Sequence, residues 1–218
     1  MADWFIATEG VKVVKDSASL WPQIITAVSS IGAALGGVHL THHYARSREE
    51  KAASARREAE LYFISTELVF RLERFAQDCA AVVQDEGEED DRGYTRTTVT
   101  AEAFSPDDIA GDWRVLPARI LYRIRELTVL IPEANRYISV VQEFDSLPDW
   151  PCTFQKRRYQ YSRLGMKVVL LSKRLRQLNH MPSSRLDASK WSAQSVLWEQ
   201  WRRGRKCRAK LAREQDNW

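Results

Sequence analysis

The sequence feature that most limits how this chain folds is an uncharged run of 29 residues, 17–45, in a chain that is 28% charged overall. A helix rises about 1.5 Å per residue, so the least polar part, residues 24–40, is about 25 Å long and the whole run is over roughly 40 Å long. These lengths bracket the roughly 30 Å hydrocarbon layer of a bilayer. The run therefore predicts a transmembrane helix over residues 21–45, preceded by a short N-terminal segment over residues 1–20.

The predicted membrane helix has two unlike faces. One face is aliphatic, and the opposite face carries small and polar residues: Gln23, Thr26, Ser30, Ala33, Gly37 and Thr41. Small residues spaced by four let helix backbones approach closely in lipid. Since Ser, Thr, Gly and His offset much of the aliphatic contribution to insertion, we expect the helix to form a homo-oligomer through this face, which would line any pore. Two alternatives remain open: a helix buried in protein and an amphipathic helix lying on the membrane surface.

Basic residues predict the orientation of this helix. Only Lys12 and Lys15 precede the uncharged run, whereas five basic residues follow it closely: Arg46, Arg48, Lys51, Arg56 and Arg57. Basic flanks favour the cytoplasmic side. We therefore predict a single-pass protein of the cell membrane, in contact with membrane lipid, with its N-terminus outside and its C-terminal domain in the cytoplasm.

The rest of the chain predicts an all-α fold. Residues 46–60 lack large apolar side chains but are rich in strong helix formers, which is typical of a solvated helical stalk. From Leu61 onward an apolar stripe appears in steps of three and four: Leu61, Ile64, Leu68, Leu72, Phe75, Cys79 and Val82. One continuous helix is therefore expected from about Trp21 to Asp85, leading into a cytoplasmic helical bundle of about four helices over residues 61–218.

Turn and charge signals divide this predicted domain. Residues 86–112 are acidic and predict an exposed loop, with a Thr-rich piece that is a candidate short strand. The sequence Ser105-Pro106-Asp107-Asp108 has the residues of a helix start. Residues 113–147 carry a helical apolar pattern that Pro132 should kink or split. Another helix is expected over residues 153–180, with a buried row of Phe154, Tyr161, Leu164, Val168, Leu171, Leu175 and Leu178, and a last helix is expected to be capped by Asp187.

The final third, residues 151–218, is basic, and residues 151–186 contain nine Lys or Arg and no acid. The residues that we predict to bind an anionic partner are Arg157, Arg158, Arg163, Lys167, Lys173, Arg174, Arg176, Arg202, Arg203, Arg205 and Lys206. Aromatic residues interleave with them, including Tyr159, Trp198 and Trp201. Lys and Arg side chains interleaved with aromatic rings are typical of nucleic-acid binding, whereas Lys and Arg side chains near a membrane are typical of binding to anionic lipid headgroups. A solvated face paired with the acidic loop over residues 86–112 is the third possibility.

The sequence lacks the common catalytic and cofactor signatures. It contains no phosphate-binding glycine loop, no dinucleotide fingerprint and no nucleophile elbow. The three cysteines are odd in number and far apart, and His39, His42 and His43 have no suitable third ligand nearby. We therefore expect no enzyme activity, no cofactor and no metal.

One short pattern offers an enzymatic alternative. Arg174 and His180 form an R-x5-H spacing. It resembles the R-x4–6-H motif of the HEPN ribonucleases, an all-helical family. The resemblance implies an RNA-cleaving site carried by Arg174 and His180.

Three functions follow, in order of preference. The first is a membrane-anchored helical homo-oligomer that acts by interaction, or as a pore-like effector that perturbs membranes, and is regulated through its basic cytoplasmic domain. The second is a helical module that binds nucleic acid. The third is a HEPN-like ribonuclease.

Overall fold

The computed structural model describes the backbone of residues 21–216 and the side chains of residues 41–210, 212 and 213. The predicted N-terminal segment, residues 1–20, lies outside this range. The elements are α1 (Trp21–Gln84), β1 (Glu88–Glu89), β2 (Thr95–Arg96), the 3-10 helix η1 (Trp113–Val115), α2 (Ala118–Glu143), α3 (Pro151–Leu178) and α4 (Ala193–Asp216). The mainly helical fold confirms the all-α prediction. The chain divides into two units, residues 1–54 and 55–218.

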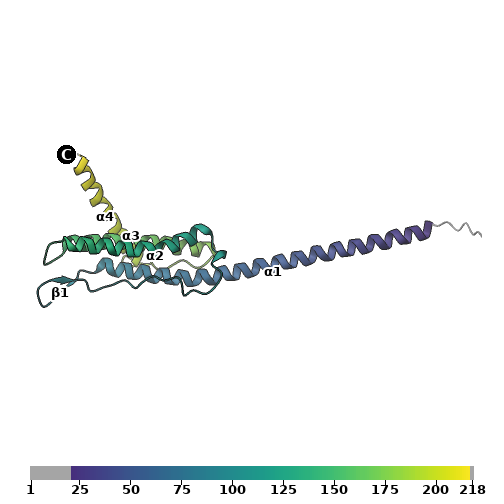
Figure 1. The fold of residues 1–218 in the computed structure, drawn as a ribbon, viewed down its shortest axis with the longest axis horizontal. Helices are drawn as coiled ribbons and strands as arrows, with labels where there is room; N and C mark the ends of the chain where they lie inside the picture. The colour runs from purple at the N-terminus through teal and green to yellow at the C-terminus, as the bar shows by residue number, and fades with distance from the viewer. Residues whose placement is uncertain (1–20, 217–218) are drawn as a thin grey trace, which may run out of the picture. The chain divides into compact units, whose positions relative to one another are not determined.

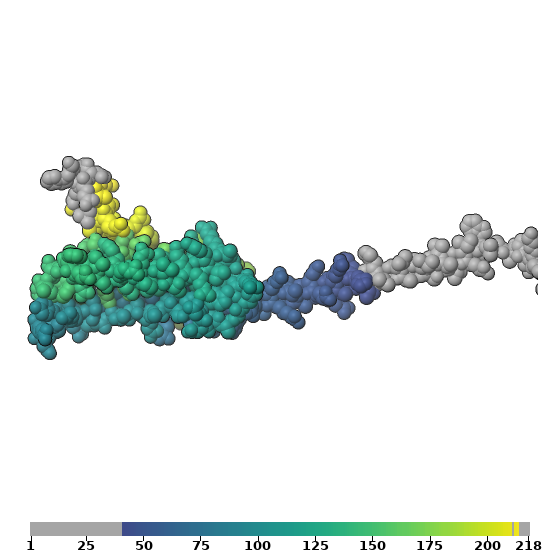
Figure 2. Space-filling view, in the orientation of Figure 1, coloured from purple at the N-terminus to yellow at the C-terminus, as the bar shows by residue number. Residues whose placement is uncertain are grey.

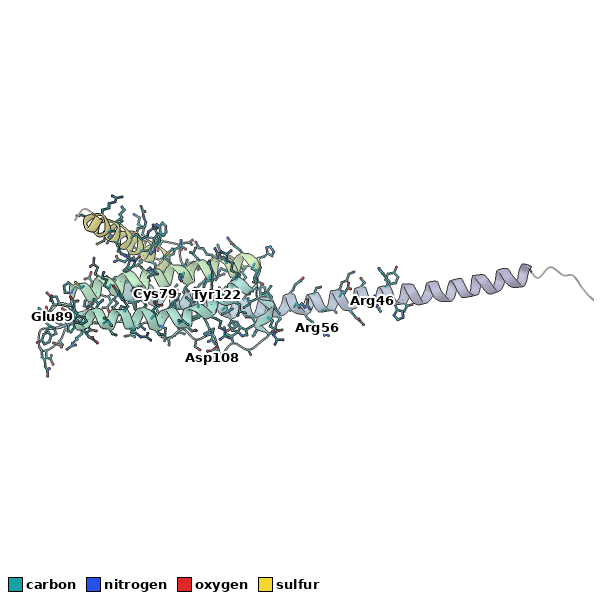
Figure 3. All side chains as sticks on the ribbon, turned by 45° about the horizontal axis from the view of Figure 1, so that its top comes forward. Arg46, Arg56, Cys79, Glu89, Asp108 and Tyr122 are labelled. Carbon is teal, nitrogen blue, oxygen red and sulfur yellow. The ribbon has the colours of Figure 1, made fainter. Side chains whose placement is uncertain are left out.

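Helix α1 is continuous over 64 residues, as the sequence predicted. Its side chains from position 46 to 59 are almost all exposed, and Figure 3 labels Arg46 and Arg56 on this stretch. This exposure fits a solvated helix made of Ala, Glu, Lys and Arg.

The predicted membrane helix over residues 21–45 falls mostly on positions whose side chains lie outside the described residues. These positions include five of the six on the small polar face, and the sixth, Thr41, is exposed. Within the described part of the chain, we find no helix with an apolar stretch long enough to span a bilayer.

The second unit is a bundle in which α2 and α3 lie alongside the C-terminal half of α1 (Figure 1). The apolar stripe of α1 faces its interior: Ile64, Leu68, Leu72, Cys79 and Val82 are all completely buried. Helix α2 contributes Ile124 and Leu127, and α3 contributes Val168 and Leu175, to the same core. The helical bundle predicted from the three-and-four spacing is thereby confirmed.

The acidic connection after α1 begins with a two-stranded hairpin, in which β1 and β2 pair antiparallel. Residues 97–112 then return along α1 toward its N-terminal side. Phe104 packs on Phe75 with ring centroids 5.8 Å apart, and farther along the backbone N–H of Asp112 donates to Glu60 Oε1 at 2.8 Å. The predicted short strand in this loop is therefore present as β2.

The predicted helix start at residues 105–108 is wrong, because these residues form a turn. Asp108 does not cap a helix, since its carboxylate pairs with Arg71 of α1 at 3.3 Å. The capping carboxylate belongs to Asp112, which accepts from the backbone N–H of Arg114 at 3.0 Å in η1. Helix α2 begins only after Pro117.

Two further expectations need correction and a third is narrowed. Pro132 does not split its helix, since α2 runs unbroken through it. One missing N–H removes only one hydrogen bond, and the buried residues Leu127 and Ala134 hold the helix on both sides of it. Leu178 is 38% exposed because it ends α3 beyond the core. Asp187 does not cap the last helix, because it lies six residues before α4 and pairs with Lys173 at 3.2 Å.

Candidate nucleic-acid interface

The structure places Arg157, a predicted partner-binding residue, inside the bundle. Its Nη1 donates to Asp85 Oδ2 at 2.8 Å, and its Nη2 donates to the carbonyl oxygen of Val99. The side chains of Arg157 and Asp85 are only 9% and 1% exposed. Arg157 is therefore a structural residue that joins α3 to the end of α1, and it is not available to an external anion.

Asp85 is the acceptor at the centre of this cluster. Its carboxylate accepts from the hydroxyl of Thr98 at 2.8 Å and from the backbone N–H groups of Thr98, Val99 and Gly87 at 3.0 to 3.1 Å. Burial alone would raise the pKa of Asp85, but these hydrogen bonds and that from Arg157 outweigh it and lower the pKa to about 2. The pair is thus charged and fully hydrogen-bonded at neutral pH.

Arg176 is also committed to the fold. It makes a bidentate ion pair with Glu73 of α1, with Nε to Oε1 at 2.7 Å and Nη2 to Oε2 at 2.9 Å. Ser172 adds a hydrogen bond to Glu73 Oε1 at 2.7 Å. Although burial raises the pKa of Glu73, the hydrogen bonds from Arg176 and Ser172 lower it overall. This pair joins α3 to α1 a second time.

The other basic residues of α3 are only partly engaged. Arg158 donates to the carbonyl oxygen of Asp85 at 3.1 Å, and Lys167 lies 3.4 Å from a carboxylate oxygen of Glu126. Arg163 lies over the ring of Tyr159.

These contacts bear on the third possibility for the basic final third. In the part of the chain described, the acids of the 86–112 loop pair with Arg71, Arg74, Arg96 and Arg125, all outside the basic third. The ion pairs of these acids thus lie elsewhere among the described residues, and pairing with the basic final third stays a prediction. Arg71 and Arg74 belong to α1, Arg96 to the loop itself and Arg125 to α2.

Helix α4 presents a different arrangement. Trp198 and Trp201 stack with ring centroids 5.1 Å apart and an interplanar angle of 26°. The guanidinium of Arg202 lies 6.0 Å from the ring centroid of Trp198, and that of Arg205 lies 4.9 Å from that of Trp201. Steps of three and four residues bring these side chains together on one helix face. With Lys206 and Ala209, the same side chains line an open groove of about 390 Å³.

The cations of this α4 face are exposed and mostly unneutralised. Arg202, Arg203, Arg205 and Lys206 are all exposed. Arg203 pairs with Glu199 one turn earlier. Within the described residues, no carboxylate forms an ion pair with Arg202, Arg205 or Lys206. We call Trp198, Trp201, Arg202, Arg205 and Lys206 the α4 cluster.

Two glycines let α4 pack closely on the bundle. A Cβ at Gly165 of α3 would lie 2.7 Å from Leu197 and 3.0 Å from Cys79 Cβ. A Cβ at Gly204 would overlap the ring of Tyr159. Leu197 and Gly204 are seven residues apart, so they lie on the same side of α4. Trp201 lies between them and is partly buried, whereas the cations of the α4 cluster are exposed.

Arg208 strengthens this docking, because it donates to the Tyr159 hydroxyl at 3.0 Å and lies over the ring of Tyr159. Sequence reasoning did not identify this role, nor those of Asp85 and Glu73. The seven-residue spacing from Leu197 to Gly204 was the signal available for the docking side.

Arg174 and His180, the predicted ribonuclease pair, lie at the C-terminal end of α3. Arg174 is an exposed residue of α3, and His180 is an exposed residue just beyond its end, in a left-handed conformation with φ of 51°. Among the described residues, no hydrogen bond joins the two side chains, and no group of three or more His, Cys, Asp and Glu is placed to hold a metal.

Comparison with known proteins found no matching family model, no matching curated protein and no matching solved structure.

Proposed function

We propose that this protein is a membrane-anchored helical homo-oligomer whose C-terminal bundle binds nucleic acid through the α4 cluster. The observation that carries the binding proposal is the stacked tryptophan pair flanked by Arg202, Arg205 and Lys206, which form no ion pair within the described part of the chain. The uncharged run over residues 17–45 and the basic residues that follow it support the anchor.

The chemistry of the α4 cluster fits a single strand better than a duplex. Single-strand binders combine exposed aromatic rings, on which bases stack, with cations that track the phosphates. Trp198 is 44% exposed, and its ring lies beside cations on the same face. Bases in a duplex are already stacked, so they would leave this ring without a partner.

Salt-dependent binding tests the proposal. We expect a fluorescently labelled single-stranded oligonucleotide to bind the full chain in mild detergent, with an affinity that falls steeply as salt rises. Replacing Arg202 and Arg205 together with Ala should lower the affinity and reduce the salt slope by about 1.4, since each phosphate contact to a single strand contributes about 0.7.

The matched control is Arg114→Ala with Arg119→Ala, which removes the same charge from exposed positions outside α4. Equal losses in the two double variants would show nonspecific attraction and would contradict the proposal. Binding to vesicles with phosphatidylserine, without binding to the oligonucleotide, would assign the α4 cluster to headgroups instead.

The anchor and its assembly are tested separately. We expect the chain to remain with membranes through an alkaline wash and to need detergent for extraction. Gly37→Leu should lower the particle mass in mild detergent, because a bulky side chain separates helices that meet through small residues. Recovery in the soluble fraction after high-speed centrifugation would contradict the proposed membrane anchor.

A pore lined by the small polar face is the more specific form of this proposal. Its members are Gln23, Thr26, Ser30, Ala33, Gly37 and Thr41. Purified protein should then release a small dye from vesicles, and Gly37→Leu should reduce that release. Intact vesicles would leave an anchor without a pore.

A further inference from the structure

Helix α2 is apolar on two opposite faces. Ile124, Leu127 and Ala134 form its buried face. On the other side lies a row of exposed apolar side chains: Tyr122 (67% exposed), Val129 (66%), Tyr137 (43%), Val140 (47%) and Phe144 (84%), the last at the helix C-cap. Figure 2 shows α2, in teal to green, forming much of the visible surface of its unit, and Figure 3 labels Tyr122. A row of exposed apolar side chains of this size on one helix face is typical of a contact surface.

We infer that this outer face of α2, here called the α2 stripe, is a self-association surface on which a second copy of the chain packs its own α2 stripe. The positions of the stripe recur in steps of three, four and seven, which is the spacing with which one helix packs against another. This surface is separate from both the α4 cluster and the N-terminal helix.

The charges beside the α2 stripe fit a second copy. A groove of about 230 Å³ along it is lined by Glu133, Tyr137, Arg163 and Lys167. A second groove of about 330 Å³ is lined by Tyr122, Arg123 and Glu126 together with α3 residues. Because both signs are present, two copies of this surface can attract each other, which a two-fold interface requires. A polyanion is a poor occupant, since Glu126 and Glu133 lie within it.

The exposed apolar area around the α2 stripe is also sufficient for an interface between two copies. Leu170, 51% exposed and lining the second groove with Tyr122, adds to the five side chains of the α2 stripe. Since a large aromatic side chain buries about 150–250 Å², the patch offers on the order of 700 Å². A standard protein interface buries about 800 Å² on each partner. Chains confined in one membrane need even less, because tethering raises their effective concentration.

Site-directed cross-linking tests the face. Position 133 is the centre of the row 122, 126, 129, 133, 137, 140 and 144, whose spacing is the same from either end. It therefore meets its counterpart whichever way the second helix runs. Glu133→Cys, with Cys152→Ser and Cys207→Ser to remove the exposed thiols, should give a dimer with a short thiol cross-linker. Ser139→Cys, exposed on α2 but off the stripe, should not.

Introducing positive charges into the α2 stripe is a second test of the self-association surface. Val129→Lys with Val140→Lys should reduce the Glu133→Cys cross-link at least about tenfold, because four like charges would enter the paired stripes. Both valines are exposed, so folding of the chain is preserved. Thr128→Lys with Ser139→Lys is the matched control and should leave the cross-link unchanged.

Equal cross-linking at positions 133 and 139, or a cross-link that survives the lysines, would overturn the inference. Oligonucleotide affinity, measured on the same variants, reports on the α4 cluster alone. Failure of the α2 inference and failure of the proposed nucleic-acid function are therefore distinguishable.

Discussion

Helices α3 and α4 carry the same kinds of basic residues but use them in opposite ways. Arg157 and Arg176 of α3 turn inward to Asp85 and Glu73 of α1. The cations of the α4 cluster are exposed, and two of them, Arg202 and Arg205, lie over tryptophan rings. The density of Lys and Arg in a sequence therefore does not distinguish a structural cation from a binding one. What distinguishes them is whether a neighbouring helix places a carboxylate within ion-pair distance.

The inward pairs make α3 the central helix of the bundle. A buried ion pair contributes little relative to apolar residues of the same shape, but breaking one partner leaves a buried charge alone. Substitutions in α3 should therefore act on stability, and substitutions in α4 should act on binding.

The largest effect should come from Arg157→Ala. It leaves the buried Asp85 carboxylate without its cation, and we expect a loss of about 3–5 kcal/mol in the free energy of unfolding, measured by urea denaturation. Arg174→Ala removes an exposed cation of the same helix and should change stability by less than about 0.5 kcal/mol. Equal effects of the two variants would break the distinction between inward and outward cations.

Lowering the pH should destabilise the fold through the same buried pair, Arg157 and Asp85. The pKa of Asp85 is lowered from 3.8 to about 2, so its contribution is fully present above pH 3.8 and is lost as the pH falls toward 2. The amount is roughly 2 kcal/mol. Stability measured between pH 5 and pH 2 should fall more steeply in the natural chain than in Asp85→Asn, which cannot titrate. Parallel pH profiles would show that Asp85 is not the responsible group.

The sequence predicted most of the bundle and less of the site. The apolar stripe from Ile64 to Val82 identified the core face of α1, because three-and-four spacing directly reports one side of a helix. The partners of Arg157 and Arg176 were not predictable. They are joined to Asp85 and Glu73 across 72 and 103 residues of sequence, and only the packing of α3 on α1 brings them together.

Local signals also failed where a distant contact outweighed them. The residues Ser105 to Asp108 have the composition of a helix start, yet Arg71 draws the Asp108 carboxylate to α1. The α4 cluster was partly predictable, because Trp198, Trp201 and Arg205 recur at helical spacing. Its outward orientation was not, since that depends on the close approach of Gly204 to Tyr159.

Gly204→Ala tests that approach and should have an intermediate effect. The added methyl overlaps Tyr159, so α4 or the ring must shift, at a cost of about 1–2 kcal/mol. Because the shift moves the α4 cluster relative to α3, oligonucleotide affinity should fall as well. Ala212→Gly, at an exposed position of the same helix outside the groove, weakens helix propensity by about 1 kcal/mol without a clash and is the control. If both variants bind equally, α4 docking does not matter to the site.

The ribonuclease alternative predicts a change in activity with little change in stability. A HEPN-like site would need both Arg174 and His180, so either alanine variant should abolish RNA cleavage. Under the proposed function, the natural chain binds labelled RNA and leaves it intact on a denaturing gel. Cleavage that both alanine variants remove would replace binding by catalysis as the role of this unit.

The smallest effect on stability should come from Glu199→Gln in α4. Glu199 and Arg203 are both more than 60% exposed, and exposed ion pairs contribute about 0–1 kcal/mol. Unfolding should therefore change by less than about 0.5 kcal/mol. Oligonucleotide affinity should nevertheless rise, because the substitution removes a carboxylate beside the α4 cluster and frees Arg203 for phosphate. The salt slope should become steeper by up to about 0.7, the contribution of one added phosphate contact. A variant with lower affinity would mean that Glu199 orients Arg203 for binding. Arg203 of α4 would then depend on a paired carboxylate, as Arg157 and Arg176 of α3 do.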